Sequence, residues 1–364
     1  MSSIIIINSS TGEYDWIMPF FKSSGERANI ILNEINEANR ELIRSDLLNY
    51  KHLDLIEPSK IMRGFLGALE KLHRRLPIIK KVCLLFFKLS YKKYDFSNAK
   101  FIFKDYSFRD ALIYECIEAL AISAKKVAFP HAFAIQIPFK GIEDVSHKCD
   151  IVLQNTKLCS RFQSHLNLIT GMPNEETKDL FDIESKNIIF FTRDDYEHYG
   201  TTNQACYKRY SEILFFLAEN CFNVFIKHHP RNRLANIKHQ DIERDFRNII
   251  YINSNLEINT RSYAFCLTFF SAASLLLTRH NVPAFDVTPY DASLLKESTF
   301  HFINPVGDYV TPLQEHGLQT VCNDLKELKN SIFLSDSSRS QQDSFREIFP
   351  DNYYKELLSL LKSS

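Results

Sequence analysis

The chain has 364 residues, and its 44 lysine and arginine side chains are balanced by 44 aspartate and glutamate side chains. This length suits two domains that each bury a core, and the balance of charge gives no sign of a general nucleic-acid or polyanion binder. The sequence contains neither a GxGxxG nor a GxxxxGK[ST] pattern, which excludes the usual dinucleotide fingerprint and the P-loop.

The amino terminus predicts a buried strand and not a targeting segment. Met-Ser-Ser is followed by a run of isoleucines, without the charged region or the cleavage site of a signal peptide. No apolar run approaches the roughly 20 residues that a membrane-spanning helix needs. The 8 cysteines are scattered and form no CxxC pair, so neither a zinc knuckle nor a disulfide framework is indicated. We therefore expect a cytoplasmic protein with reduced thiols.

In the amino-terminal half, short apolar runs alternate with helix-length segments. The expected elements are a strand at 4–8, a helical region at 60–91 that Pro77 interrupts, a strand at 101–104, a helix at 110–124, and strands at 126–129 and 151–154. Between 60 and 104 the sequence has 12 basic and 2 acidic residues, interleaved with aliphatic and aromatic ones. Such a segment either lies in the headgroup region of an anionic membrane or packs on the core with a solvated basic face.

The carboxyl-terminal half begins a second series of the same kind. The expected elements are a strand at 187–192, a helix at 203–220, strands at 223–227, 248–252 and 263–268, a helix at 271–278, strands at 284–287 and 300–303, and a last amphipathic helix at 353–362. Two such series indicate an α/β protein with two doubly wound, Rossmann-like domains. We place the first domain at 1–175, the second at 176–340, and a helical segment that can cross back to the first domain at 341–364.

The stretch FNVFIKHHPRNR is the first candidate for a functional site. An apolar strand ends there in Lys227, His228, His229, Pro230 and Arg231. In an open parallel sheet, ligands bind beyond the carboxyl ends of the strands. Proline stops the strand, and imidazole and guanidinium groups can neutralise the phosphate of a departing nucleotide. The alternative is a turn with solvated cations.

The stretch TFFSAAS is the second candidate. A strand ends at Thr268, and Ser271 then takes the N-cap position of a helix, so that backbone amides and the hydroxyls of Thr268, Ser271 and Ser274 form an anion site. One crossover separates this turn from the histidine cluster, and we expect both to bind the same phosphate. Taken alone, Ser271 would be an ordinary capping serine.

The order of a strand, KHHPR, a strand, TFFSAAS and the strand VPAFDV resembles the carboxyl-terminal half of bacterial GT-B glycosyltransferases that build surface polysaccharides. These are the capsule polysialyltransferases, the lipooligosaccharide sialyltransferases and the teichoic-acid polymerases that use CDP-glycerol. The resemblance covers about residues 126–290. It implies that His229 and Pro230 match an HP motif, and Ser271 and Ser274 a serine motif, which together bind the phosphates of a cytidine nucleotide. Ala272 stands where these families have the second of two paired serines.

The amino-terminal half supplies candidates for a general base. The turn FPHA resembles a PHG turn of these enzymes, and the imidazole of His131 can accept a proton near neutral pH. The alternative is a histidine with a structural hydrogen bond at a strand end. Sialyltransferase-like relatives use a carboxylate, for which Glu13 and Asp15, in the stretch NSSTGEYDW, and Asp105 are candidates. We rank Glu13 and Asp15 above His131 because we expect them in a compact polar loop.

The resemblance implies a GT-B enzyme with two domains that face a cleft. We expect it to transfer sialic acid or another CMP-activated sugar to a bacterial surface glycan, which is a capsule, lipooligosaccharide or O-antigen chain. A single base and direct displacement predict inversion. No DxD triplet is present, so we expect no metal and no cofactor besides the nucleotide-sugar donor.

The expected partners are the nucleotide sugar, an oligosaccharide or glycolipid acceptor and, at the periphery, the anionic inner membrane; no nucleic acid is expected. Two alternatives remain open. One is an isomerase of the UDP-GlcNAc 2-epimerase type, which would need several carboxylates for proton transfer. The other is a non-catalytic protein of polysaccharide assembly.

Overall fold

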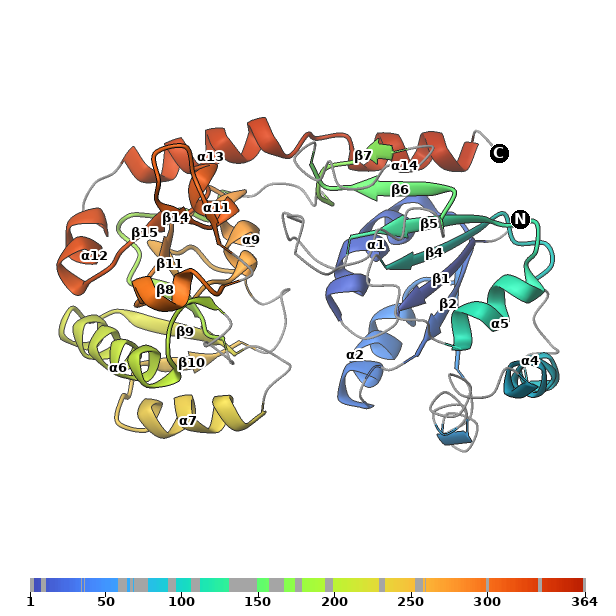
Figure 1. Cartoon of the computed structure of the whole chain (residues 1–364), viewed down its shortest axis with the longest axis horizontal. Helices are drawn as coiled ribbons and strands as arrows, with labels where there is room; N and C mark the ends of the chain where they lie inside the picture. The colour runs from blue at the N-terminus through green and yellow to red at the C-terminus, as the bar shows by residue number, and fades with distance from the viewer. Residues whose placement is uncertain are drawn as a thin grey trace. The chain divides into compact units, whose positions relative to one another are not determined.

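In the computed structural model the chain divides into two compact units, each built on its own sheet (Figure 1). Unit 1 comprises Met1–Ala134, Glu143–Glu175 and Pro350–Ser364, and unit 2 comprises Ile135–Ile142 and Glu176–Phe349. The structure describes residues 3–7, 11–33, 35, 37–57, 64–65, 68, 78–90, 96–105, 112–130, 149–156, 167–173, 179–193, 199–228, 233–252, 258, 260–298, 301–332 and 336–362.

The sheet of unit 1 has seven parallel strands in the order β3-β2-β1-β4-β5-β6-β7. The strands are β1 (Ser3–Ile7), β2 (Ala28–Leu32), β3 (Leu53–Ile56), β4 (Phe101–Asp105), β5 (Lys125–Phe129), β6 (Ile151–Gln154) and β7 (Asn167–Ile169). All of β1 is buried, because helices cover both faces of the sheet and leave the central strand no polar side.

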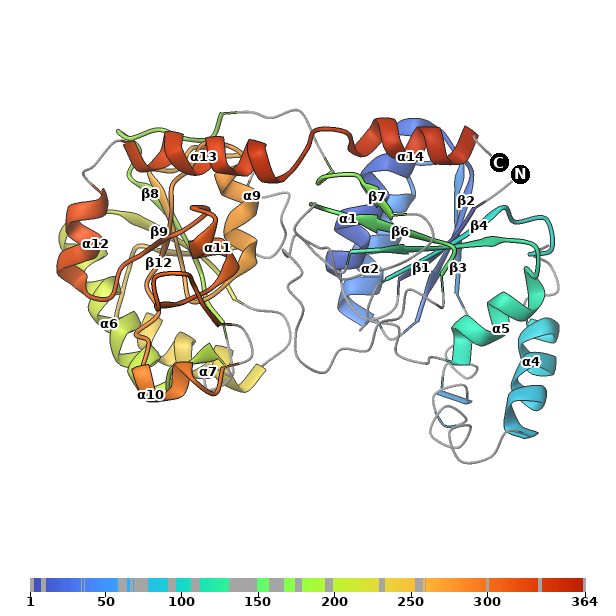
Figure 2. The same cartoon turned by 45° about the horizontal axis from the view of Figure 1, so that its top comes forward.

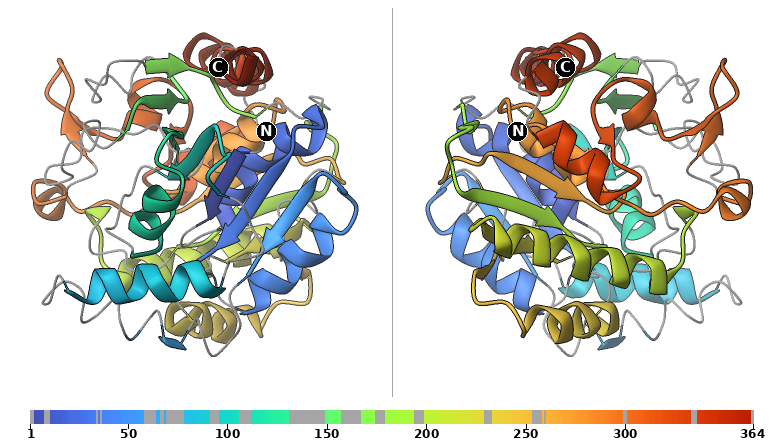
Figure 3. Two further views of the ribbon diagram at one scale, coloured as in Figure 1. Left: turned by 90° about the vertical axis from the view of Figure 1, so that its right-hand side faces the viewer. Right: turned by 90° about the vertical axis from the view of Figure 1, so that its left-hand side faces the viewer.

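The helices of unit 1 fall into two groups, one on each face of the sheet (Figure 3). On the face of Ile5 and Ile7, the core includes side chains of α1 (Thr11–Ser24), α2 (Glu37–Leu47) and α14 (Tyr353–Lys362). On the face of Ile4 and Ile6, it includes side chains of α4 (Ile78–Ser90) and α5 (Leu112–Leu120). The last helix therefore belongs to the same core as the first strand.

The sheet of unit 2 has six parallel strands in the order β10-β9-β8-β11-β12-β15. The strands are β8 (Asn187–Phe191), β9 (Asn223–Lys227), β10 (Ile249–Tyr251), β11 (Phe265–Thr268), β12 (Ala284–Asp286) and β15 (Thr320–Val321). The helices are α6 (Asn203–Glu219), α7 (Arg233–Glu243), the 3₁₀ turn η3 (Ala272–Ser274), α9 (Leu275–Thr278), α10 (Ala292–Leu295), α11 (Pro312–Glu315), α12 (Leu325–Ile332) and α13 (Asp336–Ile348).

The two parallel sheets with their crossover helices confirm the predicted α/β class with two Rossmann-like units. The structure also contains β2, β3, α1 and α2, which the sequence analysis did not predict. Of the helical region predicted at 60–91, α4 begins directly after Pro77. None of the described helices is long and apolar enough to cross a bilayer.

One local prediction was wrong, and two others were confirmed in position but not in detail. Glu13 and Asp15 lie in α1 and not in a loop, because this polar stretch leads into the buried residues Trp16 and Ile17. The helix expected at 271–278 is a 3₁₀ turn followed by four α-helical residues. The strand expected at 300–303 is β13 (Phe302–Ile303), which pairs antiparallel with β14 (Tyr309–Val310) outside the main sheet.

Candidate functional site

The strands β8, β9 and β11 end side by side at the carboxyl edge of the unit 2 sheet. The Thr192 amide donates to the Lys227 carbonyl at 3.2 Å, and the Phe269 amide donates to the Phe191 carbonyl at 3.3 Å. Neighbouring strands lie about 4.8 Å apart, so Lys227 and Thr268, which end β9 and β11 on either side of β8, are roughly 10 Å from each other. Both predicted motifs therefore begin at the same edge of one sheet.

His228, directly after β9, is held by two side chains of unit 2. Its Nδ1 lies 2.8 Å from Thr192 Oγ1, and its Nε2 lies 3.3 Å from Glu243 Oε2. The buried Glu243, at the end of α7, also accepts hydrogen bonds from the hydroxyls of Tyr210 at 2.6 Å and Tyr251 at 2.7 Å. Both ring nitrogens of His228 are engaged, so this residue positions the start of the loop after β9.

The carboxylate of Glu243 is stabilised in its charged form. Burial alone would raise its pKa, but the hydrogen bonds from His228, Tyr210 and Tyr251 and the charge of His228 outweigh this effect and hold the pKa below its usual value. The remaining residues of the cluster, His229, Pro230 and Arg231, lie outside the described residues, as does His131.

Thr268 places a buried hydroxyl at the end of β11. The residue is fully buried, and its Oγ1 has no hydrogen-bond partner in the part of the chain that the structure describes. Ser271, three residues on, accepts a hydrogen bond from the Ala273 amide at 3.2 Å, as predicted for an N-cap, and its own O–H remains available to donate.

Ser274 faces the interior of unit 2. Its hydroxyl donates to the Ser271 carbonyl at 3.1 Å and accepts from Gln319 Nε2 at 2.5 Å. Gln319 also donates to the Ser271 carbonyl at 2.9 Å. These bonds occupy the hydroxyl of Ser274 and fix the backbone at Ser271, so we assign Ser274 to shaping the turn.

The turn between β11 and η3 contains a residue with a strained backbone. Phe270 has a φ of 40°, in the left-handed region that costs a bulky residue roughly 1–3 kcal/mol. Two contacts hold it there: its amide donates to Asp286 Oδ1 at 3.4 Å, and its carbonyl accepts from Arg193 Nη1 at 2.7 Å. The Arg193 guanidinium also stacks on the Tyr199 ring, 4.1 Å from its centroid.

Asp286, at the end of β12, connects this turn to the following segments of unit 2. Its side chain accepts hydrogen bonds from the Thr288 hydroxyl at 2.5 Å, from the Tyr290 hydroxyl at 2.5 Å and from Gln314 Nε2 at 3.0 Å. Burial raises the pKa of Asp286 and outweighs the hydrogen bonds from Thr288, Tyr290 and the Phe270 amide, which lower it. The ends of four neighbouring strands, β9, β8, β11 and β12, thus share one polar network.

The predicted carboxylates belong to unit 1. Glu13, in the first turn of α1, and Asp105, at the end of β4, are both fully buried, whereas Asp15 is half-buried. β1 and β4 are parallel neighbours, with Ile5 beside Phe103, so Glu13 and Asp105 lie at the carboxyl edge of adjacent strands.

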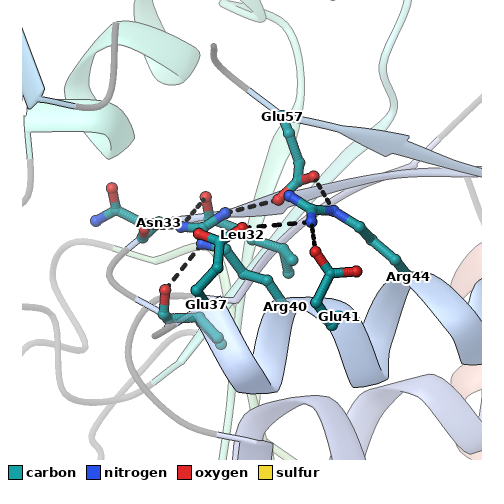
Figure 4. Close-up of polar contacts among 8 residues, drawn as sticks. Leu32, Asn33, Glu37, Arg40, Glu41, Arg44 and Glu57 are labelled. Carbon is teal, nitrogen blue, oxygen red and sulfur yellow. Dashed lines mark hydrogen bonds and ion pairs between the residues drawn. The ribbon is translucent and has the colours of Figure 1, made fainter. Parts of the chain in front are cut away.

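A buried arginine closes the ends of β2 and β3 (Figure 4). Arg40 is 3% exposed; its Nε donates to the Ile35 carbonyl at 2.8 Å and its Nη1 to Glu57 Oε1 at 2.8 Å. Its Nη2 donates to the carbonyls of Leu32 and Asn33. All three nitrogens of the guanidinium are engaged within unit 1, so this group stabilises the turn into α2 and offers no anion site.

The sequence alone indicates Thr268, Ser271 and Lys227 as site residues, but it does not indicate several other residues of this edge. Arg193 could have been found, because it follows the strand 187–191 just as the histidines follow β9. Glu243 and Asp286 gave no signal, since their contacts join segments far apart in the sequence. Among the described residues, no group of three or more histidine, cysteine, aspartate and glutamate side chains is placed to hold a metal ion.

No protein-family model matches this chain, and no curated protein sequence matches it. Solved structures resemble it over its full length. UDP-GlcNAc 2-epimerase from Neisseria meningitidis bound to UDP-GlcNAc has a TM-score of 0.60 and 11% identity, with 100% of both chains covered. MurG from Acinetobacter baumannii has a TM-score of 0.53 and 10% identity, with 100% of both chains covered.

A third similar structure, UGT71G1 from Medicago truncatula complexed with UDP-glucose, has a TM-score of 0.57 and 8% identity, with 100% of this chain and 98% of that one covered. At this level of identity the likeness concerns the fold alone. The chain therefore has the GT-B fold, as the sequence analysis predicted.

Proposed function

We propose that the chain is a nucleotide-sugar glycosyltransferase whose unit 2 binds the donor and whose unit 1 supplies the base. The observation that carries the proposal is the carboxyl edge of the unit 2 sheet, where Lys227 and Thr268 end strands on either side of β8 and Ser271 caps the helical turn that follows β11. A phosphate at this edge would lie near the cation of Lys227 and could accept a hydrogen bond from the hydroxyl of Ser271.

In the proposed reaction, an acceptor hydroxyl oxygen forms a bond to the anomeric carbon of the donor sugar. The bond from that carbon to the nucleotide phosphate breaks, and the phosphate leaves with the electron pair. Lys227, His229 and Arg231 neutralise its charge, and Thr268 and Ser271 donate hydrogen bonds to it. Direct displacement inverts the anomeric configuration, and this mechanism assigns no step to a metal ion.

The base that takes the acceptor proton is proposed among the carboxylates and a histidine of unit 1. Glu13 and Asp15 remain our first candidates, and Asp105 and His131 the others. The position of Glu13 in the first turn of α1 supports it, because this turn follows β1, and ligands of open parallel sheets bind beyond the carboxyl ends of the strands.

The donor nucleotide is proposed to carry a pyrimidine base. The KHHPR and TFFSAAS motifs favour a CMP-activated sugar such as sialic acid, and the acceptor would then be a bacterial surface glycan. Two of the similar solved structures, the Neisseria meningitidis epimerase and UGT71G1, contain UDP-GlcNAc and UDP-glucose, which favours uridine. Thermal unfolding in the presence of CMP, CDP, UDP and GDP distinguishes these cases, since only a nucleotide that binds the native state raises the melting temperature.

The mutational test of this proposal is His229→Ala. We expect turnover to fall by at least about 100-fold, because a group that neutralises the leaving phosphate is lost, with the melting temperature unchanged. Lys208→Ala, which removes a cation whose side chain is 80% exposed on α6, is the control and should retain full activity. Near-normal transfer by the His229 variant would contradict the proposal.

A UDP-GlcNAc 2-epimerase-like activity is the second candidate. Two buried carboxyl groups, Glu13 in the first turn of α1 and Asp105 at the end of β4, favour it, because epimerisation requires paired groups for proton transfer. Incubation with UDP-GlcNAc and no acceptor separates the two activities by NMR. Formation of the 2-epimer would support the epimerase, whereas turnover only with an added acceptor glycan would support the transferase. A chain that responds to no nucleotide would be a non-catalytic assembly protein.

A further inference from the structure

The helix α4 turns apolar side chains toward the solvent. Leu89 is 63% exposed, Leu85 58%, Val82 42% and Phe86 38%. Spacings of three and four residues place these side chains on one face of the helix, and Phe87, which is fully buried, anchors the opposite face in the core of unit 1. A helix on the surface of a globular protein normally has the reverse arrangement, with its polar face outward.

The exposed apolar face is extended by a neighbouring segment and bordered by cations. The ring of Phe65, itself 38% exposed, lies 5.0 Å from the ring of Phe86. Lys81 and Lys88 are exposed on α4, and the helix contains no acidic residue. In Figure 2, α4 runs beside α5 at the margin of unit 1. The face is therefore apolar along its centre and positive along its border.

Positive charge is concentrated in this part of the sequence. Residues 60–104 contain 12 basic and 2 acidic side chains, whereas the rest of the chain contains 32 basic and 42 acidic ones. Lys104 adds nothing to the surface, because it is buried and pairs with Glu118 at 2.7 Å. The sequence that contains α4 is therefore strongly basic in an otherwise neutral chain, and Lys81 and Lys88 expose two of these cations beside the apolar face, which makes this face complementary to an anionic surface.

We propose that α4 docks on the surface of an anionic lipid bilayer. Val82, Leu85, Phe86 and Leu89 would enter the boundary between headgroups and acyl chains, and Lys81 and Lys88 would contact lipid phosphates. A second copy of the chain fits this surface poorly, because a twofold contact would bring the two basic segments together. This docking does not depend on the function proposed above. It concerns only the attachment of unit 1 to a membrane surface.

The experiment is sedimentation of the full chain with vesicles of phosphatidylcholine alone or of phosphatidylcholine mixed with phosphatidylglycerol. We expect binding to the anionic vesicles that weakens as salt is added. The double variant Lys81→Gln/Lys88→Gln should bind roughly 30-fold more weakly, about fivefold for each lysine. Leu85→Glu/Leu89→Glu should lose binding with its melting temperature unchanged, because both side chains are already exposed. Leu48→Glu, at a position 83% exposed after α2, is the control and should bind like the wild type.

Two results would overturn the proposal. One is a wild-type chain that stays in the supernatant with both kinds of vesicle. The other is binding that Leu85→Glu/Leu89→Glu retains, which would place the membrane contact elsewhere. Light scattering tests the alternative occupant. If the wild type binds no vesicles but forms dimers, and Leu85→Glu/Leu89→Glu dissociates these dimers, the face is a contact with a second copy.

Discussion

At the scale of single residues, Arg40 shows how a buried charge stabilises unit 1. Its guanidinium donates to three backbone carbonyls and to Glu57, so its removal would take a buried donor from these carbonyls and one of two arginine partners from Glu57. We expect Arg40→Met to lower the free energy of unfolding by about 3–5 kcal/mol. Denaturant unfolding followed by fluorescence measures this, because the only tryptophan in the sequence, Trp16, lies in the core of unit 1.

Arg44→Met is the matched control for Arg40→Met. Arg44 also binds Glu57, at 2.6 Å, but its side chain is 32% exposed and it contacts no backbone carbonyl among the described bonds. We expect a loss of no more than about 1 kcal/mol. Equal losses for the two variants would show that the ion pair with Glu57, and not the contacts of Arg40 with the backbone, supplies the stability.

Glu57 makes the stability of unit 1 dependent on pH. Burial raises its pKa, but the hydrogen bonds and charges of Arg44 and Arg40 outweigh burial and bring the pKa below its ordinary value of 4.5. A lowered pKa in the folded state means that the stabilisation is fully present above the unfolded pKa and is lost as the pH falls through the folded pKa.

We therefore expect Glu57→Gln to be less stable than the wild type near pH 7 and to approach it in acid. Melting temperatures measured between about pH 3 and pH 7 test this expectation, since the unfolded pKa is about 4.3. Glu41→Gln removes a carboxylate that also contacts Arg44 but is 65% exposed, and it should follow the wild-type profile. A constant difference between wild type and Glu57→Gln across this range would refute the linkage.

At the scale of elements, Glu243 connects α7 to the ends of β9 and β10. Its carboxylate accepts hydrogen bonds from Tyr210 and Tyr251 and contacts His228, and an amide in its place cannot accept all of them. We expect Glu243→Gln to lower the free energy of unfolding of unit 2 by about 1.5–3 kcal/mol. Circular dichroism during denaturant unfolding measures the loss.

Asp241→Asn is the control on the same helix. Asp241 is 54% exposed and pairs with Arg244, which is 76% exposed, so we expect a change within about 0.5 kcal/mol. If Glu243→Gln were as harmless as Asp241→Asn, His228 would be held by Thr192 alone.

The elements differ in how far the sequence predicts them. The strands β4, β6 and β9 are predictable, because each is a short apolar run between polar segments. The helix α1 is not, since it opens with Thr-Gly and contains Pro19, which are typical of a loop. Tertiary packing makes this stretch helical, because Trp16, Phe20 and Phe21 are buried against the sheet. The pair Phe302–Ile303 is apolar but exposed, and so short a run cannot reveal its partner.

The candidate site, like the elements, could be predicted from the sequence only in part. Lys227, Thr268 and Ser271 follow predicted strands, and the rule that ligands bind at the carboxyl ends of parallel strands was sufficient to select them. The rule does not say which hydroxyl remains available. Ser274 has the same residue type as Ser271, yet its hydroxyl is occupied by Gln319, which lies 45 residues further along the chain. Only the tertiary structure distinguishes the two serines.

At the scale of the whole molecule, the path of the chain makes unit 1 discontinuous. After α13 in unit 2, the chain returns to unit 1 as α14, where the Tyr353 hydroxyl donates to the Trp16 carbonyl and the two rings lie 5.1 Å apart at 86°. The sequence analysis predicted the helix at 353–362 from its amphipathic pattern. Its contact with α1 joins residues more than 300 positions apart, for which a pattern of single residues gives no signal.

The segment that returns to unit 1 passes close to Gly171, and this close approach makes Gly171 sensitive to substitution. Gly171 has a φ of 74°, and a Cβ atom there would lie 1.8 Å from the Pro350 carbonyl oxygen. Gly25 has a φ of 70° but open space around it, so the two glycines share the backbone strain and differ only in crowding. We expect Gly25→Ala to cost about 1–2 kcal/mol, which is the left-handed strain alone.

Gly171→Ala should cost clearly more, because the carbonyl at Pro350 must move and the start of α14 must move with it. Trp16 fluorescence during denaturant unfolding measures both variants, and its emission in the native state reports whether Tyr353 still packs on the indole. Equal losses for the two alanine variants would mean that the segment at Pro350 shifts freely. The return of the chain would then contribute little to unit 1, whereas a larger loss at Gly171 makes α14 an integral part of its core.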